Sequence, residues 1–207
     1  MINIIIKWLN RIKSYDLTIW VLVKLTDFLT LTKFDKQKKK NKKTKLFVKY
    51  RTLTLGFDVI KNAKSIGKGF WCGGFSSVTK NTVLKDYVNF NGMKVMGNGN
   101  CTIGSYFHSG IDCLIITQNH NYDKGSMIPY DKTYIYKDVI IEDFVWMGSK
   151  VTILPGTKIG EGVIIQAGSV VHGEIPPYAI IGGNPANIIK YRDIEHFKKL
   201  KKEGKFY

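Results

Sequence analysis

The chain has 207 residues, of which 44% are apolar and 23% charged, a balance typical of one or two folded domains rather than of a disordered protein. Its net charge of +16 is high but uneven, because residues 1–52 hold 14 Lys and Arg against three Asp and so account for +11. A basic arm on a nearly balanced body predicts an anionic surface or polymer as its neighbour.

Residues 1–52 are predicted to form a basic helical N-terminal segment. Residues 1–33 intersperse charged side chains among many apolar ones, as in an amphipathic helix, and residues 33–45 are too polar to pack. Two interpretations stay open. The segment is either a helical cap that packs on the body and supports oligomerisation, or an interfacial helix with a polybasic run that binds an anionic membrane face. Nucleic-acid binding is set aside because no binding motif accompanies the charge.

The sequence also bears on the compartment. No uncharged run among the first 25 residues approaches the ~18 residues of a membrane span, and no signal peptide is evident. We therefore expect a cytoplasmic protein, peripheral at the inner face of the membrane if the second interpretation holds. Cys72, Cys101 and Cys113 have neither zinc nor redox spacing, so we expect reduced, small core residues.

A six-residue repeat dominates the second half of the chain. Val, Ile, Gly, Thr and Asn become frequent from Lys45 onward, which predicts strands. From Ile141 the hexads read IEDFVW, MGSKVT, ILPGTK, IGEGVI, IQAGSV and VHGEIP, with an aliphatic residue or Met always in the leading position. This period indicates one flat face per six residues, with the leading side chain stacked inward on its equivalents in neighbouring coils. The expected fold is mainly β, with a solenoid over residues 53–188.

The stretch VWMGSKVTILPGTKIGEGVIIQAGSVVHGEIPPYAIIGGNPANIIKYR (145–192) resembles the hexapeptide-repeat acyltransferases, and the likeness extends more loosely back through residues 89–104. The pattern is most similar to galactoside and maltose acetyltransferases and to O-acetyltransferases of bacterial capsular or surface polysaccharides. The resemblance implies a left-handed parallel β-helix, acetyl-CoA as acyl donor, and a homotrimer with its acyl-donor grooves between subunits. Residues 189–207 are expected to form a basic C-terminal helix.

The repeat breaks between Ile115 and Ile141, which are 26 residues apart, or four hexads plus two. An excursion loop over about 118–138 must therefore leave the scaffold and return, and a loop of this length is usually functional or disordered. His120 lies at its base, and a neutral imidazole suits the removal of a proton from an attacking hydroxyl. The resemblance implies the same role, because IGSYFHSGIDCLIITQNH aligns with the family stretch that ends in its catalytic histidine.

Further site residues follow from the resemblance and from the polar run around His120. The predicted acceptor-binding residues are Asn89, Asn91, Asn119, Tyr122 and Trp146, and the predicted coenzyme-binding residues are Trp146, Gly148, Ser149, Ala167, Gly168, Lys190 and Arg192. Which of the two asparagines of NFN matches the family asparagine stays open. His172-Gly173 departs from the Thr-Lys that relatives often have, so part of the grip on phosphate must come from elsewhere.

The other histidines are assigned lesser roles. We interpret His108 as structural, His172 as a rim residue that could contact coenzyme, and His196 as exposed. The four histidines have no metal-ligand spacing, so no metal is expected, which argues against the carbonic-anhydrase relatives of this fold.

The sequence thus predicts an acetyl-CoA-dependent O-acetyltransferase with His120 as general base. The predicted acceptor is a sugar hydroxyl of a bacterial capsular or surface polysaccharide or of its precursor. Two alternatives remain open, since a fold does not define a substrate. One is an acetyltransferase for an antibiotic or a free sugar. The other is a non-catalytic β-helix scaffold protein.

Overall fold

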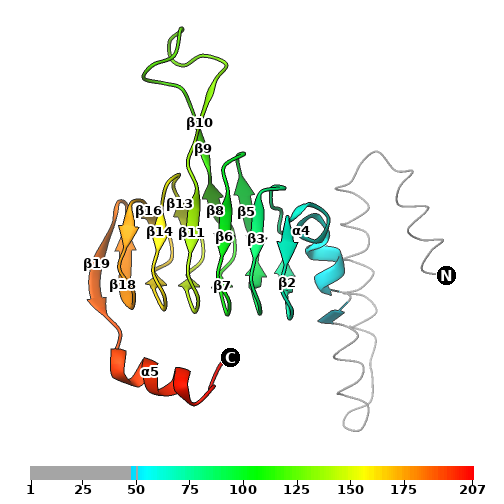
Figure 1. The fold of residues 1–207 in the computed structure, drawn as a ribbon, viewed down its shortest axis with the longest axis vertical. Helices are drawn as coiled ribbons and strands as arrows, with labels where there is room; N and C mark the ends of the chain where they lie inside the picture. Colours follow the sequence, from blue (N-terminus) through cyan, green and yellow to red (C-terminus); the bar gives the residue numbers. More distant parts are fainter. Residues whose placement is uncertain (1–47, 50) are drawn as a thin grey trace, which may run out of the picture. The chain divides into compact units, whose positions relative to one another are not determined.

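The computed structural model describes residues 48, 49 and 51–207 (Figure 1). The predicted helix 1–33 and linker 33–45 lie outside the described residues. The described chain is helical over 51–55 and in α4 (Phe57–Asn62), and strands begin only at residue 65. The prediction of strands from Lys45 onward is therefore wrong for this stretch. Leu55 and Val59 are both buried and lie four residues apart, about one helical turn, so they form the inner face of this helical stretch.

Short strands form three faces of a parallel solenoid (Figure 1). The six-stranded sheet runs β1 (Ser65–Ile66), β3 (Thr82–Leu84), β6 (Cys101–Ile103), β11 (Val139–Ile141), β14 (Lys158–Ile159), β17 (Glu174–Ile175). The seven-stranded sheet runs β2 (Trp71–Gly74), β4 (Asn89–Asn91), β7 (His108–Ser109), β12 (Trp146–Met147), β15 (Ile164–Ile165), β18 (Ala179–Gly183), β19 (Ala186–Tyr191). The four-stranded sheet runs β5 (Met93–Met96), β8 (Cys113–Ile116), β13 (Thr152–Ile153), β16 (Val170–Val171). The predicted left-handed parallel β-helix is confirmed.

The core of the solenoid is the stack of inward hexad positions. All six leading residues of the hexads from Ile141 to Val171 are at most 1% exposed. The position four residues later is fully buried in five of the six hexads and half-buried in the last, at Ile175. Burial of one such side chain contributes roughly 1.5–3 kcal/mol, so the repeat itself supplies most of the drive for folding. The three cysteines are buried and free, as predicted.

Aromatic residues form one corner of the solenoid, between the six- and seven-stranded sheets. We call Tyr87, Tyr106, Phe144 and Tyr178 the aromatic corner; each follows the six-stranded sheet in its own coil and has a φ of 56° to 63°. The Tyr87 and Tyr106 rings stack with centroids 4.8 Å apart, and the Tyr106 and Phe144 rings with centroids 5.1 Å apart. This left-handed backbone is strained for residues with a Cβ, and the ring stacking contributes to offsetting that strain.

A glycine interrupts the aromatic corner and makes room for the C-terminal helix. Gly162, with φ +70°, occupies the corner position between Phe144 and Tyr178. The ring of Phe197, from α5 (Ile194–Lys202), packs there edge-on, with its centroid 5.9 Å from that of Phe144 and 5.1 Å from that of Tyr178. The helix is thereby fastened to the solenoid through one aromatic side chain.

The C-terminal region differs from the prediction at its start. Residues 186–191 form β19, which pairs antiparallel with β18, and the helix begins only at Ile194. Asp193 caps the helix by accepting a hydrogen bond from the backbone N–H of His196 at 2.9 Å. The expectation of a helix over all of 189–207 is therefore wrong at its start. In the described part of the chain, no helix is long and apolar enough to cross a membrane.

Replacing Gly162 with alanine is expected to destabilise the fold more than replacing Gly173. Both glycines have left-handed φ values, +70° and +77°, so both variants incur the same kind of backbone strain. A Cβ at Gly162 would lie 3.0 Å from the Phe197 ring, whereas one at Gly173 would meet nothing within 4 Å. We expect Gly162→Ala to cost about 1–3 kcal/mol more in the free energy of unfolding, measured by chemical denaturation. Equal losses in the two variants would contradict the role of Gly162.

Candidate functional site

The excursion is a two-stranded antiparallel hairpin that projects beyond the stacked coils (Figure 1). Its strands are β9 (Gln118–His120) and β10 (Tyr134–Tyr136), with His120 opposite Tyr134. The chain leaves the four-stranded sheet after β8 and rejoins the six-stranded sheet at β11. His120 is thus the last residue of the outgoing strand, near the junction of hairpin and scaffold.

Two tyrosines hold the His120 ring. The Tyr130 ring stacks on it with centroids 3.9 Å apart and planes 20° apart, and the Tyr134 ring lies with its centroid 4.6 Å away. Nδ1 of His120 is buried and has no hydrogen-bond partner among the described residues. Buried polar atoms are nearly always paired, so an unpaired one is an exception that often marks a functional group. The arrangement holds an oriented imidazole whose buried Nδ1 has no partner among the described residues.

Asp131 organises the tip of the excursion. Its carboxylate accepts hydrogen bonds from the backbone N–H and hydroxyl of Thr133, at 2.8 and 2.5 Å, and from those of Ser126, at 2.9 and 3.4 Å. These bonds, those from Thr133 first, lower the pKa of Asp131 to about 2. Gly125 permits the fold of the loop, because a Cβ there would lie 2.4 Å from the Asn121 carbonyl. Asp131 is adjacent in sequence to Tyr130, so it orders the residue that stacks on His120.

The remaining predicted residues of the excursion are outward-facing. Asn119 is exposed and pairs with Ile135 in the hairpin. Tyr122 is 66% exposed, and its backbone N–H donates to the His120 carbonyl at 2.9 Å. Both lie within two residues of His120, so the structure places them at the same end of the molecule as the histidine.

A second group of predicted residues lies in register on the seven-stranded sheet. Asn89 pairs with His108, and His108 pairs with Trp146, so the three occupy one outward row. The side-chain amide of Asn89 lies 3.1 Å from Nε2 of His108. The side-chain amide of Asn91 instead donates a hydrogen bond to the Ser109 carbonyl at 2.9 Å. Of the two asparagines, Asn89 is the one that reaches its neighbours on this row.

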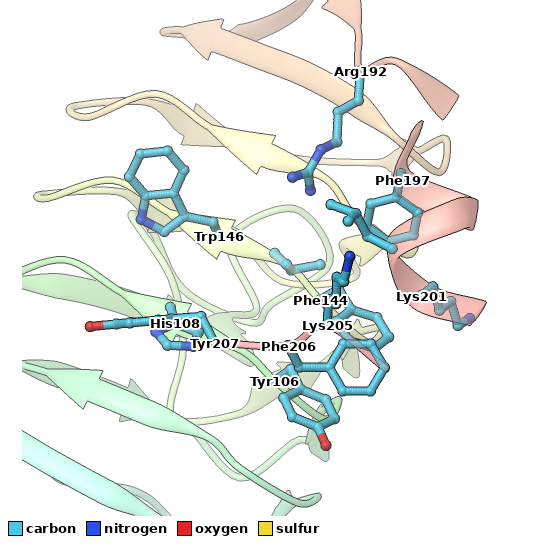
Figure 2. A pocket seen from close by; sticks show the side chains of 12 residues that line it. Tyr106, His108, Phe144, Trp146, Arg192, Phe197, Lys201, Lys205, Phe206 and Tyr207 are labelled. Carbon is cyan, nitrogen blue, oxygen red and sulfur yellow. The ribbon is translucent and has the colours of Figure 1, made fainter. Parts of the chain in front are cut away.

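A pocket of about 400 Å³ opens beside this row, between the sheet, the aromatic corner and α5 (Figure 2). It is lined by Tyr106, His108, Phe144, Val145, Trp146, Arg192, Phe197, Leu200, Lys201, Lys205, Phe206 and Tyr207. Trp146 and Arg192, both predicted site residues, belong to it. His120 does not, so one chain does not bring the predicted base and the predicted tryptophan into one pocket.

His108 is the residue whose role the sequence reasoning missed. The sequence predicts a structural role, but His108 faces outward, lines the pocket and lies with its ring centroid 5.9 Å from that of Tyr207. Burial lowers its pKa, partly opposed by a hydrogen bond with the Tyr207 backbone. A neutral ring also suits the neighbouring Asn89 amide, which can donate only to an unprotonated nitrogen. The hexad register was the available signal, because it places His108 between Asn89 and Trp146.

The predicted coenzyme-binding residues form a strip at the next corner of the solenoid. A Cβ on Gly148 would lie 2.6 Å from the Ala167 backbone nitrogen, so the two coils touch there. The Gly168 N–H donates to the Ser149 carbonyl at 2.8 Å, and Ala167 and Gly168 are exposed. The structure thus brings these four residues together. Lys190 lies apart on β19, exposed and opposite Ile180.

Within the described residues, no group of three or more His, Cys, Asp or Glu is arranged to hold a metal ion. His172 and His196 are both exposed. The described surface therefore offers three candidate sites: the imidazole of His120 at the hairpin, the glycine-rich corner, and the aromatic and basic pocket.

Known proteins resemble this chain in the same region. Residues 138–173 match the family model of the bacterial transferase hexapeptide, six repeats, which spans β11 to β16. The matched segment therefore carries the six-residue repeat of the bacterial hexapeptide transferases. The match falls on the coils whose leading residues are fully buried, so repeat, core and family model coincide.

Two curated relatives illustrate the range of the family. A chloramphenicol acetyltransferase of Klebsiella aerogenes is 36% identical over 106 residues, which cover 44% of this chain and 50% of the relative. A putative lipopolysaccharide biosynthesis O-acetyl transferase, WbbJ, of Escherichia coli K12 is 38% identical over 117 residues, which cover 53% of this chain and 57% of the relative. The chain thus spans about half the length of the curated relatives it matches.

A solved structure shares the fold. A galactoside acetyltransferase in complex with coenzyme A aligns with a TM-score of 0.54 and 20% identity, covering 86% of this chain and 80% of that one. At 20% sequence identity, this likeness shows only that the two chains share a fold.

Replacing Asp131 with alanine is expected to loosen the excursion. The variant loses four hydrogen bonds that tie Ser126 and Thr133 together, so amide hydrogen exchange over residues 120–136 should rise while exchange in the coils stays unchanged. The depressed pKa also sets the pH dependence. At pH values above the ordinary carboxyl pKa, the ionised Asp131 carboxylate holds the loop through its hydrogen bonds. This stabilisation is lost as the pH falls toward about 2 and the carboxylate is protonated. Unchanged exchange in Asp131→Ala would contradict this role.

The imidazole of His108 is expected to titrate below its ordinary pKa, because burial disfavours the charged ring. Below that ordinary value the unfolded chain binds a proton that the folded chain does not, so the free energy of unfolding falls as pH decreases through this window. NMR titration of the ring signals measures the pKa directly. The variant His108→Gln should show a flatter loss of stability on the acid side, and an ordinary titration of His108 would exclude the effect.

Proposed function

We propose that the protein is an acetyl-CoA-dependent O-acetyltransferase that acetylates a sugar hydroxyl of a bacterial capsular or surface polysaccharide or of its precursor. The observation that carries the proposal is His120, stacked against two tyrosine rings with its buried Nδ1 unpaired, at the base of the excursion that interrupts a hexapeptide-repeat solenoid. The match of residues 138–173 to the hexapeptide transferase family model supports acyl transfer as the reaction class.

The names of similar proteins support the donor and the acceptor class. The galactoside acetyltransferase holds coenzyme A, and the matched proteins include a putative lipopolysaccharide O-acetyl transferase. Acetyl-CoA is proposed as a co-substrate rather than a resident cofactor. Its acyl arm would lie along the exposed corner of Gly148, Ser149, Ala167 and Gly168, where no side chain beyond Cβ or a hydroxyl stands in the way.

The proposed reaction is a direct transfer. His120 takes the proton of the sugar hydroxyl as its oxygen attacks the thioester carbonyl, the carbon–sulfur bond breaks, and the coenzyme thiol leaves with a proton. Backbone N–H groups at the glycine-rich corner are the proposed donors to the oxyanion. The tyrosine rings hold the imidazole in one orientation, which removes part of the entropic cost of reaching the transition state.

A homotrimer is part of the proposal, because one chain separates the parts of the site. His120 lies on the hairpin, whereas Trp146 and Asn89 lie on the seven-stranded sheet, and the pocket of Trp146 does not include His120. A second copy that presents its hairpin to this sheet would assemble all three.

A second candidate is an acetyltransferase for an antibiotic or a free sugar. The chloramphenicol acetyltransferase match favours it, over about half of that relative. Profiling of acceptors separates the two, since a polysaccharide enzyme turns over de-O-acetylated polymers and not chloramphenicol. A non-catalytic scaffold would bind no acetyl-CoA.

The location at the inner membrane face is a proposal that rests on residues 1–52, most of which lie outside the described residues.

Replacing His120 with alanine is expected to lower kcat by about 10²- to 10⁴-fold, the usual contribution of a general base, with little change in the KM for acetyl-CoA. The assay is thiol release from acetyl-CoA against a panel of de-O-acetylated bacterial polysaccharides, free sugars and chloramphenicol. His196→Ala is the matched control, because His196 is exposed on α5 and contributes only a backbone N–H to the cap. Equal turnover in His120→Ala and the wild type would remove His120 from its proposed role.

A further inference from the structure

Arg192 is a cation without an acidic partner among the residues that the structure describes. Its guanidinium is half-buried, donates to the Gly162 carbonyl at 2.9 Å and lies 5.0 Å from the centroid of the Phe197 ring. No Asp or Glu of the described residues forms an ion pair with it, and burial lowers its pKa. A partly desolvated guanidinium without a counter-charge is a site for an anion.

The other two cations of the pocket differ from Arg192. Lys201 forms an ion pair with Glu161, and Lys205 forms one with Glu203 at 2.7 Å. No acidic side chain is among the residues that line the pocket. Its unbalanced charge is therefore concentrated on Arg192.

The guanidinium points into the pocket between Trp146 and Phe197 (Figure 2). The hydrogen bond to the Gly162 carbonyl and the ring of Phe197 fix the orientation of the guanidinium, so it does not extend freely into solvent. Gly162 therefore has two roles here, because its missing Cβ admits Phe197 and its carbonyl anchors Arg192. The aromatic corner and α5 together build this wall of the pocket.

The opposite wall suits a sugar ring. Trp146 is 55% exposed and offers an indole face, and beside it His108, paired with Asn89, offers hydrogen-bonding groups. A volume of about 400 Å³ is in the range of small-molecule pockets that combine aromatic walls with a few polar groups. An anion-binding guanidinium, an aromatic face and a neutral imidazole fit a ligand that is part sugar and part phosphate.

We propose that this pocket binds the acceptor as a phosphorylated sugar, with the phosphate on Arg192 and the sugar ring against Trp146 and His108. This inference rests on the proposed function, because it names the acceptor class of the same site. It removes Arg192 from the predicted coenzyme-binding residues. A sugar 1-phosphate, a nucleoside-diphosphate sugar and a lipid-diphosphate-linked sugar share this chemistry, and each is a precursor rather than a finished polymer.

Calorimetric titration tests the inference without turnover. Glucose 1-phosphate, galactose 1-phosphate, N-acetylglucosamine 1-phosphate and UDP-glucose are each titrated into the full-length protein and compared with the free sugars. At least one phosphorylated sugar should bind at least tenfold more tightly than its free sugar, and salt should weaken that binding. Loss of a charge-assisted bidentate contact in Arg192→Gln should weaken it on the order of tenfold to a hundredfold.

Arg51→Gln is the matched control for this variant. Arg51 also donates to a backbone carbonyl, that of Gly73 at 3.1 Å, but it does not line the pocket. It should leave phosphosugar binding unchanged. Thermal unfolding of both variants reports whether the loss of the Gly162 contact has disturbed α5, and Arg192→Lys, which keeps the charge, should restore part of the binding.

Coenzyme titrations separate the two sources of phosphate. Acetyl-CoA and 3′-dephospho-CoA should bind Arg192→Gln as tightly as the wild type. Weaker coenzyme binding with unchanged phosphosugar binding would overturn the inference and return Arg192 to the donor site, and so would a failure of every phosphorylated sugar to bind better than its free form. If acetyl-CoA binds no variant at all, the proposed transferase function fails, and the phosphosugar titrations still report on the pocket.

Discussion

The inward stack of aliphatic side chains at a spacing of six residues is the constraint on which everything else in this protein depends. Each leading residue packs on its equivalents one coil away, and each coil's backbone bonds to its neighbours, as Ile141 does between Ile103 and Ile159. A coil that lost its register would turn its polar residues inward. The scaffold is therefore rigid along its length, and it can place outward side chains in straight rows, such as Asn89, His108 and Trp146.

The same regularity explains why chemistry is expected where the repeat is interrupted. A stack of flat faces has no concave surface of its own, so a pocket requires an added element. The chain adds two. The hairpin carries His120 between tyrosine rings, and α5 closes a pocket over the outward row because Phe197 fits where Gly162 lacks a side chain. Each addition is anchored by local features, Asp131 in the first and Gly162 in the second.

Sequence reasoning reached the parts of this structure that repeat or follow directly from the repeat. The hexads predicted the buried residues from Ile141 to Val171, and counting from Ile115 to Ile141 located the excursion and His120. The helical residues 53–55 and α4 were missed because the composition after Lys45 resembles that of the strands that follow. The pocket was missed because it depends on contacts between distant residues, such as Phe197 with Gly162 and Tyr207 with His108, which no local pattern encodes.

The two histidines show how one scaffold can give the same side chain different tasks. His120 is stacked against two tyrosine rings and has a buried, unpaired Nδ1, an environment that supports its proposed role as a base. His108 has the Asn89 amide as a neighbour and a lowered pKa. Both favour a neutral ring, which suits a role in binding a ligand rather than in proton transfer. They lie on different elements, and the pocket that His108 lines does not include His120. In the proposed homotrimer a second chain would bring the two histidines into one site, and the unbalanced charge of Arg192 marks the edge at which an acceptor would complete it.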